Sequence, residues 1–492
     1  MIDVRREVLW FGAPPTEEMQ REFENRNLIV RHCGCAQLVD ASNACAAVFW
    51  FGADVPDAVV STARRHVRTL VDYGARVDLV TENDAAMGRL QAVAGEILKI
   101  PNIVARTNPP AHALAEGTAR HNAGPKPRAN LIVEPAKNRE PVSEADTTLL
   151  QRAFAHCSRI TLDELTGGRS GARVFAVHMI VEGSNAGLWP QPAFAKLDRR
   201  DKIEREYRNY LDFADRFIPF GLRPNVHQII RGTERSLLVG NFVDRSESLW
   251  DLARRNLAAR AVTSLFDETL GCWRDQAYAR GLIEGSVADA MYDAEMCRPQ
   301  DIRPLYPEAA QRYGISIGPD EVWKQLTALR QHYRLAPAHG DLHGENVRVK
   351  NEQAILIDLA SVLRQAPLTA DLAALETWFA FELPPECNRE QYEDLVWWSE
   401  IDRLYAPSSF IHAPGPCEPT APYCWMSTVV RQLRRLGMAT QSCPTEYQVA
   451  VAVQLLRRCQ WDDGPAADRY RRTKGYVVAA RLAEHLRTRA TT

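Results

Sequence analysis

Short apolar segments alternate with amphipathic segments over residues 7 to about 100. The apolar segments have the length of strands: EVLWF, LIVRHC, ACAAVFWFG and ARVDLV. The amphipathic segments between and after them have the period of helices: TEEMQREFENRN, VPDAVVSTARRHVRTLVDYG and DAAMGRLQAVAGEIL. Thr16 is placed to cap the first helix, and Gly74 is placed to end the second, which begins near Pro56. Strands that alternate with helices predict a parallel, doubly wound α/β sheet.

The periodicity fades between about 101 and 142, where prolines accumulate as in a linker. One segment of this stretch, NLIVEP, could instead be the last strand of the first domain. Short strands, one helix (KIEREYRNYLDFADRF) and a hairpin with the turn RGTER follow, and helices dominate after Ser248, which can cap the first of them. We therefore expect an α/β domain over 1–125, a linker over 126–142, a small sheet over 143–247 and a helical body over 248–492.

Composition excludes several classes of protein. The 492 residues contain 60 Lys and Arg against 62 Asp and Glu, and 46% are apolar, so bulk charge does not indicate binding to nucleic acid or an anionic membrane. No apolar run approaches the roughly 18 residues of a membrane span, and the N-terminus lacks the features of a signal peptide. Eleven scattered cysteines do not suggest a disulfide framework. We expect a cytoplasmic protein.

A glycine-rich segment and a lysine follow one another in the small predicted sheet. Gly167, Gly168 and Gly171 lie between two strands in LTGGRSGARV, where backbone amides could approach phosphate oxygens; a plain hairpin is the alternative. Lys196 is the lone cation of the apolar strand segment AFAKLD, so it either holds nucleotide phosphates or faces solvent at an edge.

The helix that follows this strand supplies a possible partner for the lysine. Glu206 adjoins the buried face of KIEREYRNYL and could pair with Lys196. Glu204 is the competing candidate, and either glutamate could instead be a solvated helix charge.

The segment HGDLHGEN contains His339, Asp341 and Asn346, and Asp358 follows in AILIDLASV. Carboxylate and amide oxygens such as those of Asn346 and Asp358 suit Mg²⁺. Asp341 would then accept a proton from an attacking hydroxyl, and phosphoryl transfer needs little beyond such positioning and charge neutralisation. Each residue alone fits a polar β-turn, but the ordered set makes that alternative improbable.

Taken together, these motifs resemble the aminoglycoside phosphotransferase and choline kinase superfamily over about 143–485. The resemblance implies a two-lobed, α+β protein-kinase-like fold that binds ATP and Mg²⁺. It implies that Asp341 is the catalytic base, Asn346 and Asp358 are Mg²⁺ ligands, Lys196 contacts the phosphates and Glu206 positions Lys196. In the same way, LLVGNFVD would be the hinge strand that meets the adenine.

Further positions refine this resemblance. TADLAAL would make Asp371 a structural aspartate, and His343 would have a loop-packing role; we expect Arg169 and Arg173 to be solvated. No Phe-Gly follows Asp358, no Ala-Pro-Glu appears, and the glycines are spaced GGxxG. These departures favour a small-molecule kinase over a protein kinase.

The motifs GGRSGARV, HGDLHGENVRV, LIDLASV and LTADLA together resemble most closely the kinase-like ternary-complex-associated domains of bacterial conflict and signalling systems. The expected activity is transfer of the ATP γ-phosphoryl group to a hydroxyl of a small-molecule or protein acceptor. The alternatives are a nucleotide-binding pseudokinase that serves as a scaffold, and a protein kinase.

The N-terminal domain is similar to flavodoxin-like response-regulator receivers in its order of elements. A working receiver needs an aspartate at the end of the third strand and acids after the first, but these places have VFWFG and LWFGAPP. The resemblance therefore implies a degenerate receiver that binds a protein partner or dimerises. An unrelated α/β domain is the alternative.

Overall fold

The structure is a computed structural model, and it describes residues 5–35, 40–100, 102–135, 141–165, 171–183, 187–189, 191–243, 245–387, 389, 393–412 and 414–491. The chain forms two compact units, each made of two segments: Met1–Tyr207 with Asn225–Asp244, and Arg208–Pro224 with Arg245–Thr492. Within the described ranges, no helix has both the length and the apolar character needed to cross a membrane.

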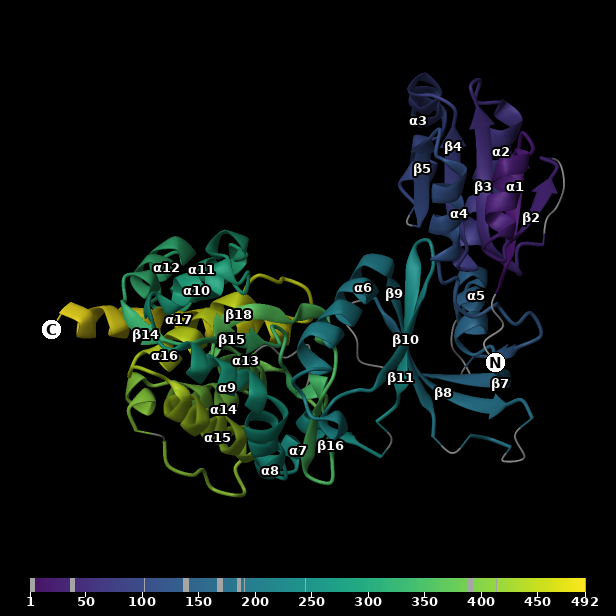
Figure 1. Ribbon diagram of the computed structural model, residues 1–492. Helices are drawn as coiled ribbons and strands as arrows, with labels where there is room; N and C mark the ends of the chain where they lie inside the picture. Colours follow the sequence, from purple (N-terminus) through teal and green to yellow (C-terminus); the bar gives the residue numbers. More distant parts are fainter. Residues whose placement is uncertain are drawn as a thin grey trace. The chain divides into compact units, whose positions relative to one another are not determined.

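The first unit begins with a five-stranded sheet in which every strand pair is parallel. Its elements are β1 Glu7–Gly12, α1 Glu17–Glu24, β2 Ile29–Cys33, β3 Ala44–Gly52, α2 Asp57–Asp72, β4 Arg76–Thr81, α3 Asp84–Leu98, β5 Ile103–Thr107 and α4 Ala111–Ala119 (Figure 1). The strand order is β2-β1-β3-β4-β5. The prediction of a parallel α/β sheet is confirmed.

Helices pack on both faces of this sheet. Apolar residues of α2 and α3 form one core with Phe11 and Phe49, and apolar residues of α1 and α4 form another with Trp10 and Val48. Successive residues of β1 and β3 thus point into different cores, which explains why both segments are continuously apolar. Thr16 caps α1 as expected, because its hydroxyl accepts a hydrogen bond from the backbone N–H of Met19 at 3.2 Å.

The second sheet of this unit has six strands in the order β10-β11-β9-β8-β7-β6. Its elements and the helices beside it are β6 Ile132–Glu134, α5 Glu144–Ala153, β7 Cys157–Glu164, β8 Arg173–Val181, β9 Ala193–Arg199, α6 Arg200–Asn209, β10 Val226–Arg231 and β11 Arg235–Asn241. All neighbours are antiparallel except β6 and β7. Helix α5 contributes Leu149 and Leu150 to a core that also contains Ala195 and Leu197.

Three features differ from the sequence interpretation. Strand β5 and helix α4 lie within the expected domain 1–125 but were not predicted as elements, because β5 is only partly buried and its sequence IVART lacks a continuous apolar run. NLIVEP is not a strand of the first sheet, since β6 pairs with β7 in the second. Helix α5 was not predicted, although Ser143 caps it by accepting a hydrogen bond from Asp146 N–H at 3.1 Å.

The second unit is mainly helical, as expected for the region after Ser248. Its strands are β12 Glu247–Ser248, β13 Ile283–Gly285, β14 Gln331–Tyr333, β15 Leu335–Ala338, β16 Val347–Lys350, β17 Gln353–Leu356 and β18 Leu363–Pro367, and they form the sheets β12-β16-β17, β13-β14 and β15-β18. Its helices are α7 Leu249–Arg254, α8 Ala259–Ser264, α9 Gly271–Arg280, α10 Val287–Asp293, α11 Leu305–Ala310, α12 Pro319–Thr327, α13 Ala370–Phe381, α14 Leu395–Leu404, α15 Cys424–Thr440, α16 Glu446–Arg458 and α17 Ala466–Thr491.

Short helical turns connect these elements. Two are π-helical, Tyr210–Ala214 and Leu265–Thr269. The others are 3₁₀ turns at Phe220–Leu222, Pro299–Asp301, Gln311–Tyr313, Gly344–Asn346, Leu359–Ser361 and Pro407–Phe410.

Helix α13 lies in the core of the second unit and packs against α15 and α16. Within this core Glu376 of α13 pairs with Arg434 of α15 at 2.6 Å, and both side chains are at most 1% exposed. Tyr447 of α16 donates its hydroxyl hydrogen to Glu376 at 2.8 Å. A buried ion pair is costly unless its hydrogen bonds are complete, so this network fixes how the three helices meet.

Candidate functional site

Lys196 and Glu206 form an ion pair in the first unit. Lys196 lies between Ala195 and Leu197 of β9, and since neighbouring strand residues point to opposite faces, its side chain leaves the core that those two residues enter. Its Nζ lies 2.8 Å from Oε2 of Glu206 on α6, and both side chains are about 7% exposed. The competing candidate, Glu204, pairs instead with Arg200 at 2.9 Å. Of the two glutamates, the structure brings Glu206 to the lysine.

The glycine-rich segment connects β7 to β8. Gly171 has φ +72°, and a Cβ there would meet no atom within 4 Å. Gly167, Gly168 and Arg169 lie outside the described residues. Arg173 was expected to be solvated, but its guanidinium makes two hydrogen bonds of 3.0 Å to the Glu164 carboxylate. It thereby joins the end of β7 to the start of β8.

In the second unit, His339 and Gly340 are fixed by the aspartate that begins α13. Asp371 accepts hydrogen bonds from the backbone N–H of His339 at 2.7 Å and of Gly340 at 3.3 Å. Burial raises the pKa of Asp371. Gly340 has φ +76°, and a Cβ there would overlap the Ser361 carbonyl, so this turn requires glycine.

His339 joins Asp341 to the strand end that carries Asp358. The Asp341 N–H donates to Nδ1 of His339 at 3.3 Å, so Nε2 carries the ring proton and donates to the Ile357 carbonyl at 3.0 Å. His339 is fully buried, whereas Asp341 is exposed. The loop thus presents the Asp341 carboxylate to solvent from a fixed backbone.

Asn346 and Asp358 are neighbours because of the hairpin that separates them. The register of β16 and β17 pairs Val347 with Leu356, and the Ile357 N–H donates to the Asn346 carbonyl at 2.9 Å. Asn346 Nδ2 donates to the Asp341 carbonyl at 3.0 Å, which orients the side-chain oxygen away from that carbonyl. Asp358 has φ +57°, a left-handed conformation that aspartate adopts more readily than most residues.

Asn346 and Asp358 fit a Mg²⁺ ion that is also bound by substrate phosphates better than they fit a metal ion bound only by protein side chains. Asn346 and Asp358 supply an amide oxygen and carboxylate oxygens, the donor types that a hard cation prefers. No group of three or more His, Cys, Asp or Glu able to hold a metal occurs among the described residues. Magnesium is commonly held by one or two carboxylates together with substrate phosphates, which matches a pair of protein ligands.

The catalytic-loop candidate also packs against α13 through His343. The imidazole stacks on Trp378, with ring centroids 5.5 Å apart and planes 25° apart, and burial lowers the pKa of His343. A Cβ on Gly344 would lie 2.5 Å from the Trp378 ring.

Asn209 is a residue that sequence reasoning missed. It ends α6, and its Nδ2 donates to the carbonyls of Leu359 at 2.8 Å and Ala360 at 3.3 Å, just after Asp358. Its local sequence gives no sign of this role.

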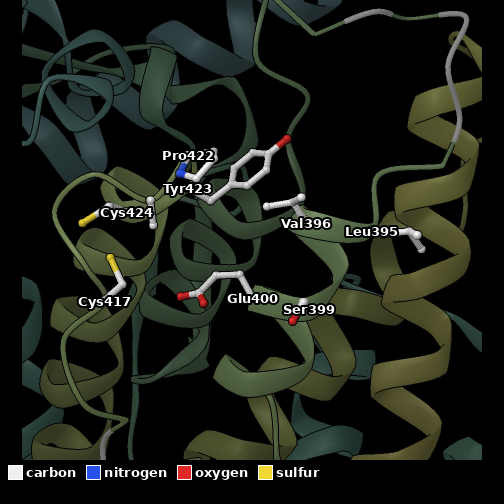
Figure 2. Close-up of a pocket in the computed structure, with 9 residues that line it drawn as sticks. Leu395, Val396, Ser399, Glu400, Cys417, Pro422, Tyr423 and Cys424 are labelled. Carbon is white, nitrogen blue, oxygen red and sulfur yellow. The ribbon is translucent and has the colours of Figure 1, made fainter.

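Two cavities lie apart from these residues. One, of about 400 Å³, lies in the second unit near the starts of α14 and α15, and Figure 2 shows the side chains around it; its lining residues are Leu395, Val396, Ser399, Glu400, Cys417, Ala421, Pro422, Tyr423 and Cys424. Its Glu400 carboxylate is paired with Arg403. The other, of about 1,160 Å³, lies in the first unit, and its lining includes Trp189, His156 and His227. Neither cavity is lined by Lys196, Glu206, Asp341, Asn346 or Asp358, but the larger one is lined by Val239, Gly240 and Asn241 of the expected hinge strand LLVGNFVD.

Comparisons with known proteins give weak similarities. No protein-family model matches the chain, and no curated protein matches it significantly. Among solved structures, a thermostable mutant of aminoglycoside phosphotransferase APH(4)-Ia is 13% identical, with 67% of this chain and 94% of that chain covered and a TM-score of 0.37. Glucosamine kinase in complex with glucosamine, ADP and inorganic phosphate is 14% identical, with 71% and 88% covered and a TM-score of 0.34. Aminoglycoside phosphotransferase APH(3'')-Id from Streptomyces rimosus is 17% identical, with 58% and 97% covered and a TM-score of 0.29. Similarities this low establish neither fold nor activity, so function is inferred from the residues of each unit.

Proposed function

We propose that the chain is an ATP- and Mg²⁺-dependent phosphotransferase that moves the γ-phosphoryl group to a hydroxyl of a small-molecule or protein acceptor. The observation that supports this most strongly is the arrangement of residues 339–358. Asp341 is exposed, and the Asn346 side chain donates a hydrogen bond to the Asp341 carbonyl. The His339 ring accepts from the Asp341 N–H and donates to the carbonyl of Ile357, the residue before Asp358. A polar turn without function would not need a fully buried histidine and a buried aspartate to fix its backbone.

Each residue has a role that its surroundings support. Asp341 accepts the proton of the attacking hydroxyl, because it is an exposed carboxylate on a rigid loop. Asn346 and Asp358 would hold Mg²⁺, which when bound neutralises phosphate charge. Lys196 contacts the phosphates, and Glu206 orients its ammonium group within a largely buried ion pair.

We also propose that the N-terminal sheet is a degenerate receiver of flavodoxin-like type, since its strand order β2-β1-β3-β4-β5 is the one found in that class. It would bind a protein partner in a cytoplasmic signalling or conflict system. The motif resemblance to kinase-like ternary-complex-associated domains supports this setting.

The test is ATP turnover by the full chain against a panel of hydroxyl acceptors. We expect Asp341→Asn to keep Mg-ATP binding and to lose about 10²- to 10⁴-fold in kcat, the usual contribution of a general base. Asp358→Ala should weaken nucleotide binding in the presence of Mg²⁺ and leave the Mg²⁺-free affinity unchanged. Asp275→Asn, an exposed aspartate on α9, is the matched control and should behave like the wild type.

Failure of the wild-type protein to bind Mg-ATP would overturn the proposal. Binding of Mg-ATP without transfer to any acceptor, unchanged by Asp341→Asn, would instead assign a nucleotide-binding scaffold. Autophosphorylation on serine or threonine would identify a protein kinase.

A further inference from the structure

The first turn of α6, the helix that carries Glu206, is bound to two other parts of the first unit. The Arg200 guanidinium donates to the Gly232 carbonyl at 2.8 Å and to the Asn102 side-chain oxygen at 3.2 Å, and it pairs with Glu204 on its own helix at 2.9 Å. Gly232 belongs to the turn between β10 and β11, and Asn102 lies between α3 and β5 of the N-terminal α/β domain. The start of α6 is therefore in direct contact with that domain.

The same hairpin turn is attached to the end of α2. The Asp72 carboxylate accepts hydrogen bonds from the backbone N–H of Thr233 at 2.6 Å and from its hydroxyl at 2.7 Å. Arg68 of α2 pairs with Glu234 of the turn at 2.5 Å. A Cβ on Gly232 would lie 2.7 Å from the Arg235 carbonyl of the same turn and 3.1 Å from the Asp72 carboxylate, so Asp72 lies close against the turn.

A buried arginine completes this junction. Arg152 of α5 is 4% exposed, and its guanidinium donates to the backbone carbonyls of Asp72 at 2.8 Å, Arg231 at 2.9 Å and Ala123 at 2.9 Å. Burial lowers its pKa to about 9, so it remains charged at neutral pH and depends on these carbonyls. Arg152 thereby holds together three segments: the end of α2 at Asp72, the end of the α/β domain at Ala123 and the start of the hairpin turn at Arg231.

We infer that the N-terminal α/β domain positions the Lys196–Glu206 pair, which we call the phosphate-binding pair. It acts through Asn102 on Arg200 and through Asp72 on the hairpin turn. Glu206 lies six positions after Arg200 on the helix, a rise of about 9 Å, so fixing the first turn fixes where Glu206 meets Lys196. The expected effect on Mg-ATP affinity rests on the proposed function. The expected effect on the rigidity of α6 does not.

The test substitution is Asn102→Gly in the full chain. Asn102 has φ +66°, a conformation that glycine adopts without strain, so the substitution removes the side-chain oxygen and leaves the turn intact. The matched control is Asn27→Gly, since Asn27 is an exposed asparagine of the same unit with φ +57°. Asn102→Asp is the rescue variant, because aspartate tolerates this backbone and its carboxylate can accept from Arg200.

Two measurements are made on each variant, hydrogen exchange of the α6 amides without nucleotide, and Mg-ATP affinity. Loss of one hydrogen bond should speed exchange at 203–207 about fivefold in Asn102→Gly. Mg-ATP affinity should fall by a similar factor, while Asn27→Gly and Asn102→Asp retain wild-type values for both.

Wild-type exchange of α6 in Asn102→Gly would overturn the inference. Faster exchange with unchanged Mg-ATP affinity would overturn the link to the phosphate-binding pair. If the wild type binds no Mg-ATP, the proposed function fails, and the exchange data alone decide whether the α/β domain positions α6.

Discussion

The buried glutamate at the start of α16 makes the second unit sensitive to pH. Glu446 is fully buried, and its carboxylate accepts hydrogen bonds from the backbone N–H of Ser442 at 2.5 Å and from the Thr369 hydroxyl at 3.1 Å. Burial raises its pKa from 4.5 to about 7, because the two hydrogen bonds compensate only part of the lost hydration. The substitution Glu446→Gln removes the ionisation and keeps the size of the side chain.

The sign of the effect follows from proton binding in the two states. Between pH 4.5 and about 7 the folded protein holds a proton at Glu446 that the unfolded chain has released, so the free energy of unfolding falls as pH rises through this window. Above pH 7 the full cost is present, and the pKa difference corresponds to about 3 kcal/mol. The introduced glutamine can still accept from Ser442 and can donate to Thr369, so Glu446→Gln should be more stable than the wild type at pH 8 by up to about 3 kcal/mol. Near pH 4.5 the two proteins should be equally stable.

The assay is urea unfolding of the full chain at pH 5 and pH 8, with calorimetry to follow the transition of the second unit. For a unit of this size, about 3 kcal/mol corresponds to roughly 6–12 °C in Tm. Glu484→Gln, on the exposed face of α17, is the control and should shift neither transition. A Glu446→Gln protein that is less stable than the wild type at pH 8 would refute the reasoning, since it would mean that the ionised carboxylate stabilises the fold.

Three further substitutions probe the second unit. Arg434→Met leaves Glu376 buried without its cation and should lower the free energy of unfolding by about 3–5 kcal/mol in urea titrations; a loss below about 1 kcal/mol would contradict this. Gly344→Ala places a Cβ against the Trp378 ring and should cost about 1–3 kcal/mol and reduce turnover, measured by calorimetry and ATP assay. Asp371→Asn keeps one acceptor oxygen for two backbone donors, so it should cost about 1–3 kcal/mol and weaken turnover, while wild-type kinetics would show that the aspartate does not fix the loop.

Much of the fold follows from the period of the apolar residues. The segment that became β3 is apolar at every position because helices cover both faces of its sheet, so its character as a central strand was recognisable. Strand β5 escaped detection because its edge position leaves it partly exposed, and α4 because its alanine-rich sequence shows little amphipathic contrast. Such elements are defined by their neighbours more than by their own pattern.

The candidate site could be predicted where residue type and spacing determine the chemistry. A strand lysine and a helix glutamate ten residues later were recognisable as possible partners, and the structure pairs Lys196 with Glu206. Asn209 could not be found in this way, because its partners are two backbone carbonyls 150 and 151 residues away. Backbone acceptors carry no residue identity, so a sequence pattern cannot reveal them.

The acceptors around Arg152 are likewise backbone carbonyls, so a sequence pattern cannot reveal them, and they bear on how the chain can be divided. The boundary expected near residue 125 is a prediction based on composition. Removing residues 1–125 would take the Asp72 and Ala123 carbonyls away from Arg152 and leave its guanidinium with fewer hydrogen-bond acceptors. This would lower the stability of the remaining chain more than a cut in a segment that makes no buried contacts. It would also remove Asn102 from Arg200 and Asp72 from Thr233. A shortened chain that failed to bind nucleotide would therefore not show that the residues of the candidate site are inactive, because the helix that carries Glu206 would have lost part of its support.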